Sequence, residues 1–151
     1  MKIMIPLYEP SLGKDEKKYV NDCLNTNWIS SKGKYISIFE NEFKKFIGSN
    51  YAVSVCNGTA ALHLALLVLN LKKNDEVIVP TLTYIASVNA IKYVGAKVKF
   101  IDSKYSDWQI NENLIEKNIT KRTKAIIVPH IYGQISDMQK IKKICDKNKI
   151  C

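Results

Sequence analysis

The fold of this chain is decided by residues 51–66, which read Tyr51-Ala52-Val53-Ser54-Val55-Cys56-Asn57-Gly58-Thr59-Ala60-Ala61-Leu62-His63-Leu64-Ala65-Leu66. The first five residues form a short β-branched run that is typical of a strand, and the apolar run after Thr59 favours a helix. Between them, Asn57-Gly58 allows the positive φ angles of a sharp turn, and Thr59 is a residue type that caps helices. We therefore expect a strand over 51–55, a tight turn, and a helix capped by Thr59.

A glycine turn that leads directly into a helix can bind an anion. The first backbone N–H groups of a helix have no partner within the helix, and the helix dipole favours a phosphate there. Thr59 adds a hydroxyl donor. The pattern is neither a Walker motif nor Gly-x-Gly-x-x-Gly, and an Asn-Gly turn followed by a Thr cap also occurs in connections that bind no ligand. The residues alone leave both interpretations open.

The composition is that of a globular protein. The 151 residues, 46% of them hydrophobic and 25% charged, are enough for one ordinary domain. No apolar run approaches the roughly 20 residues of a membrane span, and the amino-terminal residues lack the apolar region of a signal peptide. We expect a cytoplasmic protein with no membrane partner. The four cysteines and two histidines show no metal-ligand spacing, which predicts free thiols and no metal site.

The net charge of +9 raises the alternative of a nucleic-acid-binding protein. Arg122 is the only arginine, whereas base readout and bidentate phosphate recognition favour arginine. The lysines are interspersed with acidic residues, as in residues 14–18, which is typical of a solvated helix face. We therefore expect no nucleic-acid partner, and a positive field that suits a small anionic substrate.

Strand and helix patterns alternate along the rest of the chain. Helices are predicted over residues 14–25, 35–46, 85–94, 111–119 and 137–147, the last through a capping box from Ser136 to Gln139, and strands over residues 76–80, 97–102 and 124–129. The stripe of Ile36, Phe39, Phe43 and Phe46 is predicted to be core. This alternation predicts an α/β fold: a parallel-rich sheet with helices on both faces.

The residues after the last predicted helix, Lys149-Ile150-Cys151, resemble the first residues of another buried strand. A sheet that stopped there would have an open edge. We therefore expect the fold to be truncated at Cys151.

Polar residues follow each predicted strand, where ligands bind in parallel sheets. They are Asn57, Gly58, Thr59, Thr81, Thr83, Tyr84, Asp102, His130, Tyr132, Gly133 and Gln134. The Tyr84 ring either covers a flat heteroaromatic ligand or packs beside the next helix. His130 is either a base or a histidine hydrogen-bonded to backbone, and Asp102 either contacts substrate or caps its loop. His63, in an apolar helix, is predicted to be structural.

Several ordered motifs resemble the DegT/DnrJ/EryC1/StrS aminotransferases. They are Asn57-Gly58-Thr59-Ala60-Ala61-Leu62, Asp75-Glu76-Val77-Ile78-Val79-Pro80 with Thr83-Tyr84, Lys124-Ala125-Ile126-Ile127, and His130-Ile131-Tyr132-Gly133 with Asp137-Met138. The resemblance covers essentially the whole chain. It implies the amino-terminal part of the large domain of a fold-type I pyridoxal-phosphate enzyme, active as a homodimer. Residues 1–34 would be an amino-terminal arm, helix and active-site loop, and residues 35–151 an incomplete cofactor-binding domain.

The resemblance also implies site residues. Asn57, Gly58 and Thr59 would bind the phosphate of pyridoxal 5'-phosphate, and Tyr84 would stack on its ring. Residues near the substrate would be Trp28, Ser30, Lys32, Tyr132 and Gln134. The implied reaction moves an amino group from glutamate to a nucleotide-linked 4-keto-6-deoxy sugar for surface polysaccharide synthesis.

The lysine that forms the Schiff base with the cofactor matches no position in this chain and is expected beyond Cys151. The chain alone is therefore predicted to contain no catalytic residue and to be inactive. Two alternatives stay open. One is a sugar 3-dehydratase of the same family, which has histidine in place of that lysine, and the other is a non-catalytic fragment.

Overall fold

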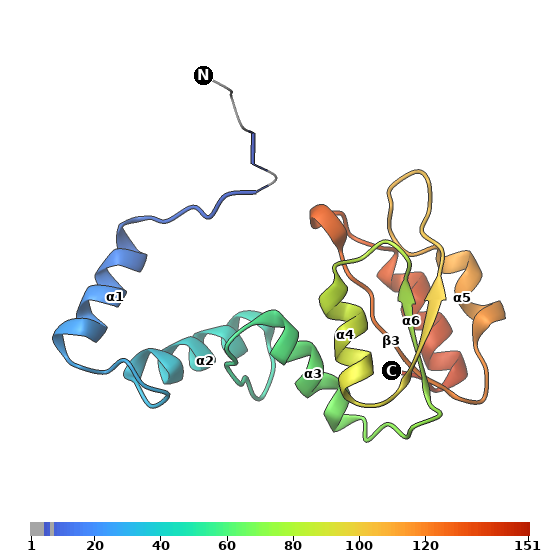
Figure 1. Ribbon diagram of the computed structural model, residues 1–151, viewed down its shortest axis with the longest axis horizontal. Coiled ribbons are helices and arrows are strands. Elements are labelled where there is room, and N and C mark those ends of the chain that lie inside the picture. Colours follow the sequence, from blue (N-terminus) through green and yellow to red (C-terminus); the bar gives the residue numbers. More distant parts are fainter. Residues whose placement is uncertain (1–4, 7) are drawn as a thin grey trace. The chain divides into compact units, whose positions relative to one another are not determined.

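The computed structural model describes residues 5–6 and 8–151, which form two compact units that divide between Ser54 and Val55 (Figure 1). The elements of the smaller unit are α1 (Lys14–Asn25) and α2 (Lys34–Ile47). Those of the larger unit are α3 (Gly58–Val68), β1 (Glu76–Pro80), α4 (Ile85–Tyr93), β2 (Lys97–Ile101), α5 (Glu112–Asn118), β3 (Thr123–Ile126), the 3₁₀ turn η1 (Ile131–Gly133) and α6 (Met138–Asn148). The predicted division into residues 1–34 and residues 35–151 follows functional parts rather than these compact units, and it stays a prediction.

The two helices of the smaller unit are joined by polar contacts. Asp22 of α1 accepts a hydrogen bond from the Tyr35 hydroxyl at 3.0 Å and pairs with the Lys34 ammonium at 2.7 Å. These contacts hold the pKa of Asp22 below its ordinary value, the Lys34 contact contributing most. The predicted helices over 14–25 and 35–46 are confirmed to within one residue at each end.

The aromatic stripe of α2 is not a core, so that prediction is wrong. Phe39, Phe43 and Phe46 are 55%, 45% and 89% exposed, and Gly33 is the one buried residue among those described in the smaller unit. Helical periodicity marks an apolar face, but burial requires a second element to cover it. Neither α1 nor the residues that follow α2 cover the apolar face of α2.

The predicted strand over residues 51–55 is also wrong. These residues belong to no strand, and the side chains of Tyr51 and Val53 are 86% and 71% exposed. Glu40 of α2 holds Ser54 instead, accepting hydrogen bonds from its backbone N–H at 2.8 Å and its hydroxyl at 2.9 Å. β-Branched residues favour an extended backbone, but a strand also needs a pairing partner.

The larger unit is built on a parallel sheet in the order β2-β1-β3. The predicted strands over 76–80 and 97–102 are confirmed, whereas the third ends at Ile126, three residues before its predicted end. On the far side of β3, the Cys151 N–H donates to the Lys124 carbonyl at 2.9 Å and the Ile126 N–H donates to the Cys151 carbonyl at 2.8 Å. Cys151 therefore continues the ladder on the edge of β3, as expected of the first residues of a further strand.

Helices cover both faces of the sheet, as predicted (Figure 1). Because side chains alternate along a strand, Val77 and Val79 of β1 pack on one face with α3 and α4, through residues such as Leu66 and Ile91. Ile78, between the two valines, packs on the opposite face with the buried isoleucines of α5 and α6. All five residues of β1 are buried, so β1 is the centre of the core.

A charged cluster lies at the first residue of β1. The Glu76 carboxylate is buried and accepts hydrogen bonds from the Thr120 hydroxyl at 2.7 Å and from Arg122 Nε at 3.1 Å. Lys99 lies 3.7 Å away. The hydrogen bond from Thr120, with these cations, holds the pKa of Glu76 below its ordinary value, although burial acts in the opposite direction.

We expect Glu76→Gln to lower the free energy of unfolding at pH 7 by roughly 1–3 kcal/mol, because the charged acceptor of these bonds is lost. A depressed pKa means that the carboxylate stabilises the fold above its unfolded-state pKa, and that this stability is lost as the pH falls through the folded-state pKa. Urea denaturation of both chains from pH 7 to pH 3 measures the difference, which should shrink toward the acid end.

Glu116→Gln is the matched control, because Glu116 pairs with Lys147 at the protein surface, where both side chains are at least half exposed. Its effect should stay within about 1 kcal/mol. A difference between wild type and Glu76→Gln that did not change with pH would contradict the role of the charge.

Candidate functional site

The site lies along the carboxyl edge of the sheet, the end to which the strand arrows point in Figure 1. Short connections join α3 to β1 and β1 to α4, and both helices pack against the sheet. α4 runs antiparallel to β1, which places its amino terminus at the carboxyl edge, whereas α3 packs on α4 and lies obliquely to the strands, with its carboxyl end leading to the start of β1 (Figure 1). The loops that follow β2 and β3 reach the same edge.

Asn57, rather than Thr59, caps α3. The Asn57 side chain accepts a hydrogen bond from the Ala60 N–H at 2.9 Å, and the backbone carbonyl of Asn57 accepts from Ala61. The expected positive φ angles are also absent, since Asn57 has an extended backbone with φ −166° and Gly58 is already the first residue of α3. The asparagine cap leaves Thr59 inside the first helical turn, with its hydroxyl free to turn outward.

The first turn of α3 fits a phosphate group. Within the part of the chain that the structure describes, no acceptor is assigned to the N–H groups of Gly58 and Thr59, which lie at the positive end of the helix dipole. A Cβ atom built on Gly58 would meet no other atom within 4 Å, so there is open space beside these donors. The residues predicted to bind a cofactor phosphate thus include two N–H donors at the start of α3 that have no assigned acceptor within the described chain.

Tyr84 immediately precedes α4 at the same edge. Its ring is 76% exposed, so it does not pack beside the helix, which was one of the two open interpretations. Thr83 and Ser87 share a hydrogen bond at 3.1 Å across the start of α4. The exposed ring is available to cover a flat ligand.

Asp102, after β2, caps its own loop. Its carboxylate accepts hydrogen bonds from the Ser103 N–H at 3.0 Å and from the Thr81 hydroxyl at 3.2 Å. These bonds connect the ends of β1 and β2. The contacts are those of the loop-capping interpretation rather than of a substrate ligand.

The turn after β3 presents Tyr132, whose side chain is 72% exposed. Tyr132 has a left-handed backbone, with φ 54°, and its ring meets that of Trp108 edge to face, with 6.2 Å between centroids. Trp108 is also left-handed, with φ 63°, a conformation that costs a bulky residue about 1–3 kcal/mol. His130 Nδ1 accepts a long hydrogen bond, 3.4 Å, from the Ser136 N–H, as expected for a histidine bonded to backbone.

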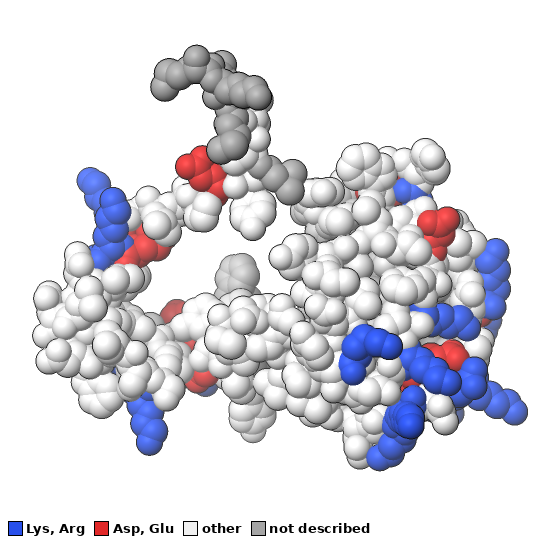
Figure 2. Space-filling view, viewed as in Figure 1, with Lys and Arg blue, Asp and Glu red and all other residues white. Residues whose placement is uncertain are grey.

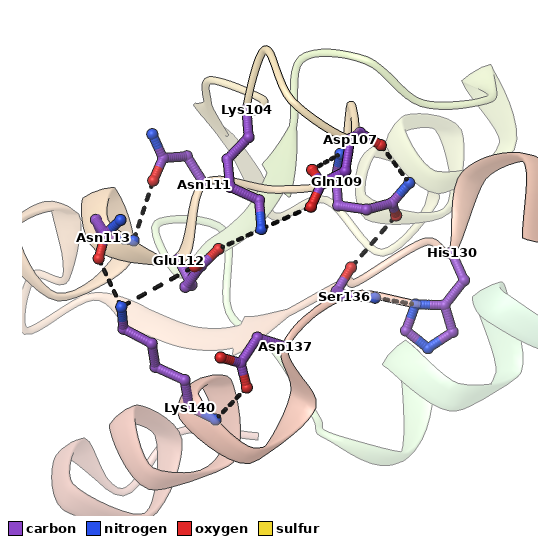
Figure 3. Close-up of polar contacts among 10 residues, drawn as sticks. All are labelled: Lys104, Asp107, Gln109, Asn111, Glu112, Asn113, His130, Ser136, Asp137 and Lys140. Carbon is purple, nitrogen blue, oxygen red and sulfur yellow. Dashed lines mark hydrogen bonds and ion pairs between the residues drawn. The ribbon is translucent and has the colours of Figure 1, made fainter. Parts of the chain in front are cut away.

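Gln109, which the sequence did not single out, and Ser136 are buried polar residues of this region (Figure 3). The predicted capping box from Ser136 to Gln139 is wrong, because Asp137 caps α6 and accepts a hydrogen bond from the Lys140 N–H at 3.0 Å. The Gln109 amide donates to the carbonyls of Asp107 and Ile131, at 3.2 Å each, and accepts from the Ser136 hydroxyl at 3.3 Å. A glutamine in a loop gives no signal of burial in a single sequence. Its role becomes visible only when the loops after β2 and β3 are brought together.

An ion-pair network supports the loop that holds Gln109 (Figure 3). The Lys104 ammonium lies 2.9 Å from the Asp107 carboxylate and 3.1 Å from the buried Glu112 carboxylate of α5. The hydrogen bond with Asp107 contributes most to raising the pKa of Lys104, and the same contact lowers the pKa of Asp107. Both groups therefore stay charged near neutral pH, which keeps the loop anchored to α5.

Three of the remaining predicted substrate residues lie in the smaller unit and one lies in the larger unit. Trp28, Ser30 and Lys32 lie on the loop between α1 and α2, and the Trp28 side chain is 54% exposed. The predicted Gln134 follows η1 at the carboxyl edge and is exposed. No contact joins these residues into one site within either unit as described.

Charge on the larger unit is unevenly distributed. On the face shown in Figure 2, basic side chains gather over the lower and right-hand parts of this unit, with acidic side chains among them, whereas the carboxyl edge is mostly uncharged. Among the residues described, no group of three or more His, Cys, Asp or Glu side chains is placed to hold a metal ion. No helix within the described ranges is long and apolar enough to cross a membrane.

The architecture is that of an α/β protein whose ligands bind at helix amino termini beyond the ends of parallel strands. Residues 10–151 match the model of the DegT/DnrJ/EryC1/StrS aminotransferase family, and the chain belongs to this family. It is 54% identical over 146 residues to GDP-perosamine synthase of Escherichia coli O157:H7, covering 97% of this chain and 40% of that protein. The family resemblance seen in the sequence is confirmed.

Two solved structures give the same result. An aminotransferase from Psychrobacter cryohalolentis superimposes with a TM-score of 0.87 and 34% identity, over 93% of this chain and 36% of that one. GDP-4-keto-6-deoxy-D-mannose-3-dehydratase of E. coli, with bound hydrated PLP, superimposes with a TM-score of 0.88 and 29% identity, over 99% and 40%. The predicted fold class is confirmed, and the chain spans about 40% of the length of its relatives.

We expect Gly58→Ala to leave the fold intact and to weaken phosphate binding. The backbone of Gly58 is not left-handed and a Cβ meets no other atom, so the free energy of unfolding should stay equal or rise by up to about 1 kcal/mol. The Cβ would occupy the open space beside the donors, and binding should weaken about tenfold, the effect of losing roughly 1.4 kcal/mol. Thermal unfolding and phosphorus NMR titration of pyridoxal phosphate measure the two quantities.

Thr59→Ser and Thr59→Val form a matched pair for the same site. Serine keeps the hydroxyl and should bind pyridoxal phosphate like the wild type, whereas valine has a similar shape without the donor and should bind more weakly. Equal binding by Gly58→Ala, Thr59→Val and the wild type would show that the phosphate does not bind at the start of α3.

Proposed function

We propose that this chain forms the phosphate-binding part of a pyridoxal-phosphate-dependent enzyme. The observation that carries this proposal is the amino terminus of α3, where no acceptor is assigned to the N–H groups of Gly58 and Thr59 among the described residues and a Cβ on Gly58 would lie in open space. These donors and the Thr59 hydroxyl bind the phosphate oxygens, with Asn57 capping the helix, while the exposed ring of Tyr84 covers the pyridine ring. When bound, the cofactor takes up an amino group from an amino acid and passes it to a carbonyl compound.

The substrate that we propose is a nucleotide-linked 4-keto-6-deoxy sugar, aminated with glutamate as the donor, as in a GDP-perosamine synthase. Support comes from the 54% identity to the E. coli O157:H7 enzyme of that name, compared with 29% to the dehydratase. Tyr132 and Gln134 at the carboxyl edge, and Trp28, Ser30 and Lys32 in the smaller unit, are the residues that we assign to substrate. The product would serve surface polysaccharide synthesis.

The lysine that binds the cofactor covalently is proposed to lie outside these 151 residues, so that the chain alone is inactive. The homodimer and the cytoplasmic location expected from the sequence are part of the same proposal. Because the chain spans about 40% of its relatives, the remaining part of such an enzyme would supply the groups at the other end of the cofactor.

A second candidate is a sugar 3-dehydratase of the same family. It is favoured by the structural match to the E. coli dehydratase, which extends over 99% of this chain with a TM-score of 0.88. A non-catalytic fragment that keeps the phosphate site is a third candidate. The residue at the position of the Schiff-base lysine separates the aminotransferase from the dehydratase, and conversion of the sugar separates both from the non-catalytic fragment.

A chimera tests the proposed reaction. This chain replaces the matched 40% of E. coli O157:H7 GDP-perosamine synthase, and mass spectrometry follows conversion of the GDP-linked 4-keto-6-deoxy sugar in the presence of glutamate. We expect an aminated, glutamate-dependent product, because the chain supplies the phosphate site and the host supplies the covalent lysine. The same chimera with Thr59→Val should need more pyridoxal phosphate to reach full activity.

The intact host enzyme is the positive control, and a chimera with the corresponding segment of the dehydratase is the matched comparison. Because the host supplies the lysine, loss of water from the sugar without amination would contradict the proposed amination, whereas the residue at the lysine position of the full-length protein decides between aminotransferase and dehydratase. A chimera that binds the cofactor but converts no sugar would favour the non-catalytic fragment. The 151-residue chain alone should give no borohydride-stable lysine adduct with pyridoxal phosphate, and a specific one would contradict the proposed location of the lysine.

A further inference from the structure

Two exposed aromatic rings lie side by side at the carboxyl edge with no packing role in the core. Trp108 is 55% exposed and Tyr132 is 72% exposed, and their rings are 6.2 Å apart at an interplanar angle of 67°. Two large apolar side chains left in solvent contribute little to folding. An edge-to-face pair also leaves ring faces open to a third flat group.

The backbone at both rings is held in an unfavourable conformation. Trp108 and Tyr132 have φ values of 63° and 54°, in the left-handed region that bulky residues rarely adopt. Such conformations persist where the surrounding structure fixes them, and they are common at binding sites. The backbone that positions this pair is therefore determined by other residues.

Gln109 is the residue that joins the two ring-bearing segments (Figure 3). It follows Trp108 directly and is 1% exposed, and its amide donates to the carbonyl of Ile131, the residue before Tyr132, at 3.2 Å. The buried Ser136 hydroxyl, at the far end of the turn, donates to the side-chain amide oxygen of Gln109, Oε1, at 3.3 Å. One buried amide thus fixes the loop after β2 against the turn after β3.

The Trp108 side of the pair is fixed within its own loop. The Trp108 N–H donates to the Lys104 carbonyl at 3.0 Å, and the Lys104 N–H donates to the Gln109 carbonyl at 2.8 Å. The Asp107 carboxylate accepts from the Gln109 N–H at 3.0 Å and pairs with the Lys104 ammonium. These hydrogen bonds close the loop, so the backbone that carries Trp108 is fixed before a ligand binds.

We propose that Trp108 and Tyr132 form a stacking platform for the base of the nucleotide-linked substrate, and that Gln109 is the positioning residue that sets the platform. A nucleobase is flat and uncharged, which suits the exposed ring faces of this pair. The choice of guanine as the base rests on the proposed function. Tyr84, before α4, remains the residue that we propose covers the pyridine ring of the cofactor.

Saturation-transfer NMR with GDP-mannose and the 151-residue chain tests this platform. We expect the strongest saturation at the guanine H8 proton and weak saturation on the mannose ring. Trp108→Gly should weaken binding of the base by roughly tenfold, whereas Trp108→Phe, which keeps a ring, should retain most of it. Glycine adopts the left-handed backbone without strain, so Trp108→Gly is expected to fold.

Gln109→Leu tests the positioning role, with Gln139→Leu, an exposed glutamine of α6, as the matched control. Gln109→Leu should reduce saturation of the base, while Gln139→Leu should not. Binding of pyridoxal phosphate, measured on the same samples, should stay unchanged in all four variants, which shows that the chain is folded. It also separates this inference from the proposed function, whose failure would appear as loss of pyridoxal phosphate binding by the wild type.

Three results would overturn the proposal. The first is a wild-type chain that binds pyridoxal phosphate but shows no saturation of GDP-mannose. The second is saturation centred on the mannose ring, and the third is a Trp108→Gly chain that binds the base as well as the wild type. If Gln109→Leu binds the base normally, the platform stands but its assigned positioning residue is wrong.

Discussion

The structure of the larger unit depends on the burial of β1 on both faces and its pairing on both edges. Val77 and Val79 face α3 and α4, Ile78 faces α5 and α6, and β2 and β3 bind the strand on either side. A strand in this position has no solvent-exposed surface, which is why its five residues contain no side chain that faces water. Both layers of helices are attached through this one strand.

The two ends of β1 differ in their roles because different polar groups lie at each end. At the amino end, Glu76 is satisfied by Thr120 and Arg122 and stabilises the sheet. At the carboxyl end, Pro80 ends the strand and the chain opens into loops, and the amino terminus of α4 lies nearby. Among the described residues of the larger unit, α4 begins at this second end with N–H groups that lack intrahelical partners, so this end suits an anion.

The loops at the carboxyl edge are held by local polar networks rather than by apolar packing. Asp102 and the Lys104–Asp107 pair stabilise the loop after β2, and Gln109 joins this loop to the turn after β3. Such networks fix backbone positions while they leave aromatic rings exposed, as at Tyr84 and Trp108. A preorganised polar framework with exposed rings is what a site for flat ligands requires. The family membership agrees with this arrangement, because the relatives include an enzyme solved with PLP bound.

The sequence by itself determined the elements whose signals are local. The apolar run at Glu76–Pro80 forms a strand where it was predicted, and the predicted helix over 85–94 is α4 to within one residue. Tertiary structure decided what depends on distant partners. Residues 51–55 have strand propensity but no strand to pair with, the Phe39 stripe has no covering element, and Gln109 is buried only because two loops meet over it. Propensity is a property of a segment, whereas pairing and burial are properties of two segments, and a single sequence does not state which segments meet.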